Sequence, residues 1–204
     1  MQKKIQKIMT VMIGLFTLYC LMTLIYRLSA QNGQTSGSLS NSIYEFLKQF
    51  SFLNDMLYEW DQFVIKVLEK LNLEPLYPHL FSTYSNWQFI IRKWAHFSIY
   101  FCLGSAGLSV FTYIFNFYKG YLITLYMGVI YAFTDEIHQL FIEGRTGQIT
   151  DFGIDVLGLF TALTLGLVIY IIVRIFVGLY QIIKWVYNKY SQTKETKRLV
   201  SQTS

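Results

Sequence analysis

The sequence has little charge, very little proline and very little cysteine. Of its 204 residues, 14% are charged and 53% are hydrophobic, and there are only two prolines and two cysteines. A soluble domain of this size usually displays more charge, so the composition indicates an integral membrane protein. Cys20 and Cys102 lie in separate apolar runs, and a pair in that arrangement gives no disulfide framework.

The formal net charge is +5, but it does not indicate a nucleic-acid partner. Most lysines and arginines lie beside long apolar runs, where membrane topology places them. Nucleic-acid binding is therefore excluded as an explanation of the basic composition.

Four apolar runs are long enough to cross a membrane as helices, since about 20 apolar residues span the hydrocarbon core. We predict spans over residues 8–26, 94–118 and 121–141, and a fourth from about residue 151 to 173. The first run follows three lysines and is long for a signal peptide, so we expect an uncleaved anchor. The predicted fold class is all-α, a polytopic membrane bundle of four transmembrane helices plus two amphipathic helices in an extracytoplasmic loop.

The chain divides into four predicted segments. These are a first transmembrane helix (1–30), an extracytoplasmic amphipathic loop (31–88), a core of three transmembrane helices (89–178) and a basic cytoplasmic tail (179–204). The loop opens with QNGQTSGSLSNS, which we interpret as a polar linker. Ser42 and Glu45 then form a possible capping box for a short amphipathic helix through Phe50. A second helix is predicted over 57–71, before Pro75 and Pro78.

The distribution of lysine and arginine predicts the orientation. With the N-terminus in the cytoplasm, ten of the seventeen basic residues fall in short cytoplasmic segments, and the 31–88 loop, with six acids against three lysines, falls outside. This arrangement obeys the positive-inside rule. We therefore expect a multi-pass protein of the cell membrane with both termini in the cytoplasm.

Polar residues concentrate between the third and fourth runs and at the start of the second. A charged side chain at membrane depth costs at least a few kcal/mol, so several together indicate a shared polar site. Helical spacing gives each run one polar face: Lys93, His96 and Tyr100; Asp135, His138 and Gln139, with Glu136 turned about 100° away; and Asp151 and Asp155 above Gly158. The predicted topology brings all of these residues to one depth.

Such a set of side chains can pair charges, relay protons or bind a phosphate. The alternative is a salt-bridge and hydrogen-bond network that only fixes helix register. His96, His138, Asp135 and Asp151 are of the types that bind zinc or manganese. No HExxH or equivalent spacing accompanies them, so we predict no metal site and no cofactor. No serine or cysteine nucleophile lies at a recognisable spacing from the histidines.

The pattern of these residues resembles the VanZ family of small bacterial membrane proteins, named for a member associated with teicoplanin resistance. The resemblance covers about residues 89–170 and rests on three motifs: Lys93-x-x-His96-x-x-x-Tyr100-x-x-Leu103; Asp135-Glu136-x-His138-Gln139-x-Phe141-x-x-Gly144-Arg145; and Asp151 with Gly158 seven residues on. Many relatives have Asn where this chain has Asp155, which adds a charge here. The resemblance implies a role in the cell envelope.

We predict an outward-facing polar pocket that engages an anionic envelope lipid or lipid-linked precursor. Asp135, Glu136, His138 and His96 are the residues expected to transfer protons if chemistry follows binding. The residues expected to contact the ligand are Lys93, Tyr100, Gln139, Arg145, Asp151 and Asp155. Two alternatives stay open: a non-enzymatic membrane-organising or binding protein whose polar cluster is structural, and, less favoured, a transporter. The sequence fixes neither the reaction nor the oligomeric state.

Overall fold

The computed structural model describes residues 2–53, 55, 58, 59, 62, 66, 70, 87–145 and 147–203, and it describes the side chains of these residues except 87–89 and 191–203. Its elements are α1 (Gln2–Ser29), α2 (Gly33–Leu47), α5 (Trp87–Ile114), α6 (Phe117–Gln139) and α7 (Ile149–Thr203). No strand occurs within these ranges, which confirms the all-α class. The second amphipathic helix, predicted over 57–71, falls mainly outside the described residues.

Three helices of the described chain are long and apolar enough to cross a membrane. They are Gln2–Ser29, Ile90–Ile114 and Ile149–Tyr190. Helix α6 has 23 residues, which is long enough to span a membrane. It includes Lys119, Asp135 and Glu136, however, and is not among the helices apolar enough to be candidate spans. The spans predicted over 8–26, 94–118 and 151–173 are therefore supported, and the span predicted over 121–141 stays a prediction.

The N-cap of helix α2 lies ten residues before the predicted cap at Ser42. The side chain of Asn32 caps it by accepting a hydrogen bond of 2.8 Å from the backbone N–H of Thr35. The stretch interpreted as a polar linker is thus helical, and the capping box at Ser42 was wrong. Asn is among the strongest N-cap residues, and the serines inside α2 bond back to carbonyls one turn earlier, as Ser40 does to Ser36 at 2.9 Å.

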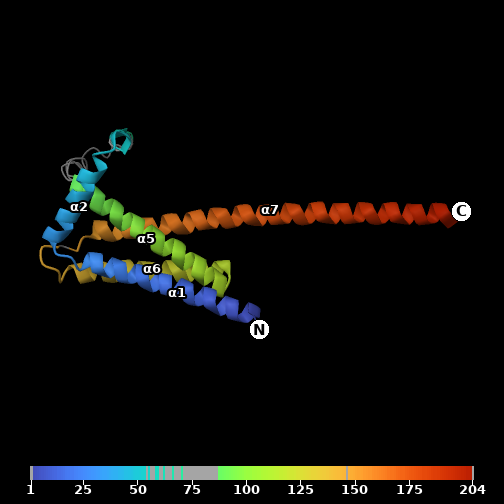
Figure 1. Cartoon of the computed structure of the whole chain (residues 1–204), viewed down its shortest axis with the longest axis horizontal. Coiled ribbons are helices and arrows are strands. Elements are labelled where there is room, and N and C mark those ends of the chain that lie inside the picture. The colour runs from blue at the N-terminus through green and yellow to red at the C-terminus, as the bar shows by residue number, and fades with distance from the viewer. Residues whose placement is uncertain are drawn as a thin grey trace. The chain divides into compact units, whose positions relative to one another are not determined.

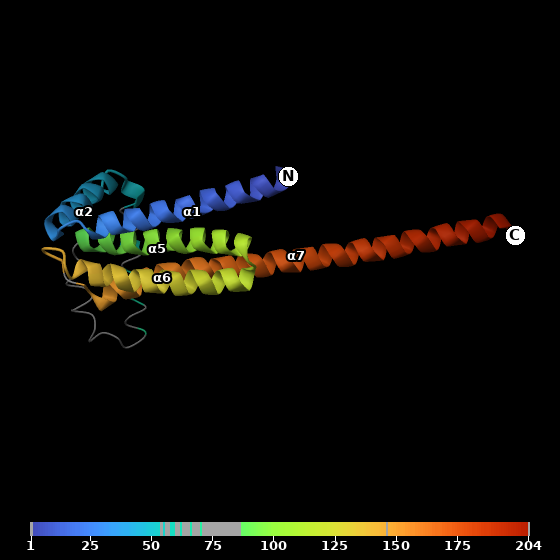
Figure 2. The same cartoon turned by 90° about the horizontal axis from the view of Figure 1, so that it is seen from below.

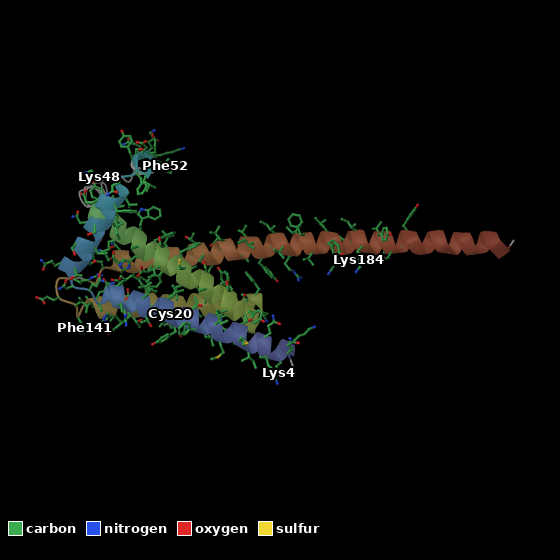
Figure 3. The ribbon with its side chains drawn as sticks, viewed as in Figure 1. Lys4, Cys20, Lys48, Phe52, Phe141 and Lys184 are labelled. Carbon is green, nitrogen blue, oxygen red and sulfur yellow. The ribbon has the colours of Figure 1, made fainter. Side chains whose placement is uncertain are left out.

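The chain forms two compact units, Met1–Leu163 and Thr164–Ser204. In the first unit α1, α5 and α6 lie side by side, and α2 lies across one end of them (Figures 1 and 2). Helix α5 packs against α6, α1 and α2, and α1 also contacts α6. Lys4 and Phe141 mark opposite ends of this bundle in Figure 3. The turn from α1 to α2 and the loop from α6 to α7 share the end near Phe141.

Those two connections touch through a pair of glycines. Gly33 donates its N–H to the carbonyl oxygen of Glu143 at 3.2 Å, and a Cβ added to Gly33 would overlap the backbone of Gly144. Gly144 has φ of 70°, in the left-handed region that glycine adopts without strain. The local sequence therefore allows a close approach that holds both connections at one end of the bundle.

The first turns of α7, up to Leu163, pack closely on α5. A Cβ at Gly158 would overlap the carbonyl oxygen of Phe97, and a Cβ at Gly104 would lie 3.0 Å from that of Ala162. Leu159 and Leu163 are fully buried in the core beside these small residues. Gly158 and Ala162, which have small-xxx-small spacing, thus bring two backbones together and fix the position of Asp155, one turn before Gly158.

In the second unit α7 continues as a helix to Thr203. Its large apolar side chains, such as Ile175, Phe176 and Trp185, are more than half exposed. A helix that is apolar on all sides is typical of a lipid environment.

Candidate functional site

Four acidic or imidazole side chains from three helices converge inside the first unit. They are His96 of α5, Asp135 and Glu136 of α6, and Asp155 of α7, and one ligating atom from each lies within 4.8 Å of the others. The three carboxylate residues are buried, with exposed fractions of 6%, 8% and 0%. We call these four residues the acidic cluster.

His96 and Asp155 are joined directly. The Nδ1 atom of His96 lies 3.0 Å from Oδ1 of Asp155. The other carboxylate oxygen of Asp155, Oδ2, is buried and has no hydrogen-bond partner among the described residues. The close packing at Gly158, one turn later in α7, holds Asp155 at this depth. Asp155 therefore has one oxygen committed to the histidine and one available.

Gln139 links the other two carboxylates of the acidic cluster. Its Nε2 donates to Asp135 at 3.3 Å and lies 3.5 Å from Glu136, one turn earlier on the same helix. Glu136 also accepts a 2.9 Å hydrogen bond from the backbone N–H of Gln148. Glu136, which the helical spacing had turned away from Asp135, thus joins the same site and ties it to the start of α7.

Arg145 lies in the loop after α6 and acts as a clamp between loops. Its Nε donates to the carbonyl oxygen of Gln31 at 2.8 Å and its Nη2 to that of Leu28 at 3.1 Å. Its Nη1 donates to the amide oxygen of Gln139 at 3.3 Å. Burial lowers the pKa of this guanidinium, and the nearby positive charge of Arg92 lowers it further. Arg145 holds the end of α1 beside the acidic cluster.

Lys93 and Asp151 form an ion pair outside the acidic cluster. Both are nearly buried, with side-chain exposures of 7% and 2%, and the Lys93 ammonium also donates to the hydroxyl of Thr150 at 3.4 Å. Arg92, the preceding residue, places one guanidinium nitrogen 3.8 Å from Asp151. Asp151 therefore pairs with the basic start of α5, one turn away from Asp155.

A cavity of about 80 Å³ opens beside the acidic cluster. Its polar lining residues are Arg92, His96, Asp135 and Arg145, together with the serines at 29, 36 and 40. Its apolar lining residues come from α1, α2 and α5 and are Ile25, Leu28, Leu39, Ile43, Ile91, Ala95 and Ile99. We call this space the headgroup cavity. Its lining combines charged groups with aliphatic side chains.

Tyr100 also lines the headgroup cavity and is fully buried, with 0% of its surface exposed. Its hydroxyl has no hydrogen-bond partner among the residues that the structure describes. Its ring lies 6.4 Å, between centroids, from that of Tyr131, whose hydroxyl donates to the carbonyl oxygen of Met22 at 2.6 Å. Tyr100 is therefore held in place by packing while its polar atom stays available.

The structure brings together most of the predicted site residues. His96, Asp135, Glu136 and Asp155 form the acidic cluster, Gln139 and Arg145 bond to it, and Tyr100 lies beside it. His138 lies apart: its ring stacks on that of Tyr26, with centroids 4.7 Å apart. Whether any of these residues contacts a ligand or transfers a proton stays a prediction.

Arg92 is the residue that the sequence analysis missed. Its neighbour Lys93 was assigned to the site from the sequence, whereas Arg92 was not included. Adjacent residues on a helix point about 100° apart, so Lys93 turns to Asp151 and Arg92 reaches the wall of the headgroup cavity. The signal in the sequence was the pair of adjacent basic residues, which places one cation on each of two faces.

Chemically, the arrangement holds opposite charges in two adjoining places. The guanidiniums of Arg92 and Arg145 can meet an anion, since planar guanidinium groups bind phosphate and carboxylate well. The acidic cluster and the buried Tyr100 hydroxyl can instead exchange a proton or bind a cation. No serine or cysteine nucleophile was expected here, and the free cysteines Cys20 and Cys102 are exposed on α1 and α5.

Apolar helices long enough to span a bilayer, with buried charges gathered near one end of the bundle, define an all-α integral membrane protein with a buried polar site. Residues 14–176 match the VanZ/LLP1 family. The chain belongs to this family, as its motifs had indicated. No curated protein and no solved structure matches it.

Proposed function

We propose that this protein binds an anionic lipid, or a lipid-linked precursor of the cell envelope, in the headgroup cavity. The observation that carries the proposal is the lining of the cavity, which combines two arginines and a histidine with aliphatic side chains. A ligand with a charged head and a hydrocarbon tail matches both kinds of lining residue. Ligand sites are generally apolar with a few converging polar groups.

Arg92 and Arg145 are the two guanidiniums that we expect to meet the headgroup, because both line the cavity. Arg92 also lies 3.8 Å from Asp151, and Arg145 also donates to two backbone carbonyls, so Arg92→Gln is the variant that leaves those backbone contacts intact. Charge-assisted hydrogen bonds from a guanidinium to a phosphate are about twice as strong as neutral ones. The volume of about 80 Å³ suits a headgroup, with the acyl chains lying along α1 and α2.

The cavity lies at the end of the bundle where α2 and the loop from α6 to α7 are found. With both termini in the cytoplasm, as the positive-inside rule predicts, this end faces outward. Envelope precursors and glycopeptide antibiotics act at that surface. A contribution to teicoplanin resistance, which the family resemblance implies, then follows from holding or altering a lipid-linked precursor there.

Mass spectrometry of lipids that copurify with the protein tests the binding step. The matched variants are Arg92→Gln, in the cavity wall, and Arg27→Gln, an exposed arginine near the end of α1. We expect one class of anionic lipid to be enriched with the wild type and with Arg27→Gln, and to be lost with Arg92→Gln. Equal lipid profiles for all three proteins would reject the proposal. Melting curves in the same detergent separate lipid loss from unfolding.

Resistance is tested separately, by teicoplanin susceptibility in a host without its own copy of the gene. Expression of the wild type is expected to raise the inhibitory concentration of teicoplanin. Expression of Arg92→Gln at equal abundance is expected to leave that concentration unchanged. If both proteins protect equally, the cavity does not serve resistance.

A second function is favoured by the way the basic residues are used. Lys93 pairs with Asp151, and Arg145 bonds to Leu28, Gln31 and Gln139. Such a network suits a non-enzymatic membrane-organising protein whose polar residues fix the helices. Under this alternative no lipid class is enriched, and variants lose function only as far as they lose stability.

A further inference from the structure

We propose that the acidic cluster is a binding site for a divalent transition-metal ion, Zn²⁺ or Mn²⁺. The ligands are His96, Asp135, Glu136 and Asp155. This site shares His96 and Asp135 with the lining of the headgroup cavity, but it depends on the carboxylates and not on the arginines, so the two proposals are tested by different variants.

The donor set fits these metals. One imidazole with three carboxylates suits Zn²⁺ and Mn²⁺, since imidazole favours the transition metals and carboxylate accommodates both ions. The four residues come from α5, α6 and α7, so helix packing fixes the site. The sequence analysis had considered His138 and Asp151 as partners instead, and the structure places His138 against Tyr26 and Asp151 against Lys93.

The distances are close to those that a metal requires. Two ligands bound at about 2.1 Å in a tetrahedral site lie about 3.4 Å apart. The four ligating atoms lie within 4.8 Å of one another, so the site closes on an ion when side chains move by up to about 1 Å. Rotation about side-chain bonds supplies such a shift without moving the helices.

Charge also favours a cation here. Three buried carboxylates so close together repel one another unless a proton or a positive ion offsets their charge. Of the basic side chains beside the cluster, Lys93 pairs with Asp151, which is not part of the cluster, and Arg145 donates to the amide of Gln139. A divalent cation bound by all four residues offsets the negative charge of the carboxylates and so removes their repulsion.

Two buried polar atoms point independently to a ligand at this place. Oδ2 of Asp155 and the hydroxyl of Tyr100 belong to side chains with 0% exposure, and neither atom has a hydrogen-bond partner among the described residues. Buried polar groups are nearly always satisfied, so each such atom requires an explanation. Tyr100 lines the same cavity as His96 and Asp135. A metal ion with a bound water satisfies both atoms.

Metal analysis of the full-length protein tests the site. The protein is purified with a streptavidin-binding tag, because a polyhistidine tag would itself bind metal, and is dialysed against Zn²⁺ or Mn²⁺ before elemental analysis. We expect about one equivalent of one of these ions in the wild type, retained in a tenfold excess of Mg²⁺. If the wild type binds neither ion, the proposal is overturned, and protons are then what neutralises the buried carboxylates.

Three variants locate the ion. Asp135→Asn with Glu136→Gln, and separately His96→Gln, are expected to raise the Kd for the metal at least tenfold, whereas Glu143→Gln, an exposed acid in the neighbouring loop, is expected to leave it unchanged. Equal binding by all variants would place the ion elsewhere and overturn the proposal.

X-ray absorption spectroscopy of the loaded wild type keeps the test decisive if those variants fail to fold. One imidazole and several oxygens are expected around the ion. Two or more imidazoles, or any sulfur, would contradict the ligand set proposed here.

Discussion

Lys93 of α5 and Asp151 of α7 form an ion pair in which both side chains are nearly excluded from solvent, with exposures of 7% and 2%. Thr150 and Arg92 lie beside the pair, at 3.4 Å from Lys93 and 3.8 Å from Asp151. The pair fastens the first turn of α7 to the first turns of α5. It fixes the helix that supplies Asp155 to the acidic cluster.

Removing one partner of this pair is expected to be costly. Lys93→Met or Asp151→Asn leaves one buried charge uncompensated, which typically lowers the free energy of unfolding by about 3–5 kcal/mol. The double variant Lys93→Met with Asp151→Leu removes both charges and is expected to recover most of that loss. Thermal unfolding in detergent measures the effect. Single variants that melt with the wild type would show that the pair carries no stability.

Arg145→Gln is expected to loosen the end of the bundle. The carbonyl oxygens of Leu28 and Gln31 lose a charged donor, and hydrogen bonds to charged groups contribute about 1.5–3 kcal/mol. Arg145→Lys recovers only part of this, because an ammonium cannot reproduce the planar fork of a guanidinium.

The measurement for Arg145 is a melting curve beside that of Arg27→Gln, which changes an exposed arginine of α1. An unchanged melting temperature for Arg145→Gln would mean that the clamp is dispensable, and would favour ligand contact as the purpose of this residue.

Two glycines of α7 give a matched test of helix packing. A Cβ at Gly158 overlaps the backbone of Phe97, whereas a Cβ at Gly153 has nothing within 4 Å. Gly158→Ala is therefore expected to destabilise the protein by about 1–3 kcal/mol through overpacking. Gly153→Ala is expected to stabilise the helix by up to about 1 kcal/mol. Similar melting temperatures for the two variants would contradict the close contact between α5 and α7.

Labelling with an impermeant thiol reagent tests the orientation. In a variant without the native cysteines, Ser38→Cys in α2 is expected to be labelled in intact cells, and Lys4→Cys near the N-terminus only after lysis. Both positions are exposed. The expectation follows from the excess of lysine and arginine beside the segments placed inside. The opposite pattern would turn the headgroup cavity toward the cytoplasm.

The long helices could be predicted from the sequence because an apolar run that crosses a membrane satisfies its backbone hydrogen bonds by forming a helix. Their caps could not, as α2 shows: Asn32 competes with Ser42, and both are good N-cap residues. Tertiary contact decides between them, since Gly33 must meet the loop at Gly144. The residues at the start of α2 therefore join the helix although their composition is that of a linker.

The site was predictable as a set of residues and not as a set of contacts. Asp151 and Asp155 share one face of a helix, and spacing alone cannot tell which one meets Lys93 and which meets His96. The contact of Gly158 with α5 sets the depth of both residues and so decides their partners. The same limit applies to Arg92 and Lys93, whose directions depend on the rotation of α5.

Lys93 lies far along the chain from the groups that it contacts, and this separation affects how the protein is synthesised and inserted. Lys93 donates to Thr150, which follows it by 57 residues, and Asp151 is the next residue. Synthesis at about 5–20 residues per second delays the arrival of Thr150 by about 3–11 s after Lys93 has been added. During that interval the ammonium of Lys93 lies close to the membrane and cannot yet pair with the carboxylate of Asp151. We therefore expect the ammonium of Lys93 to stay at the membrane surface, or under the cover of the cell's insertion machinery, until α7 arrives.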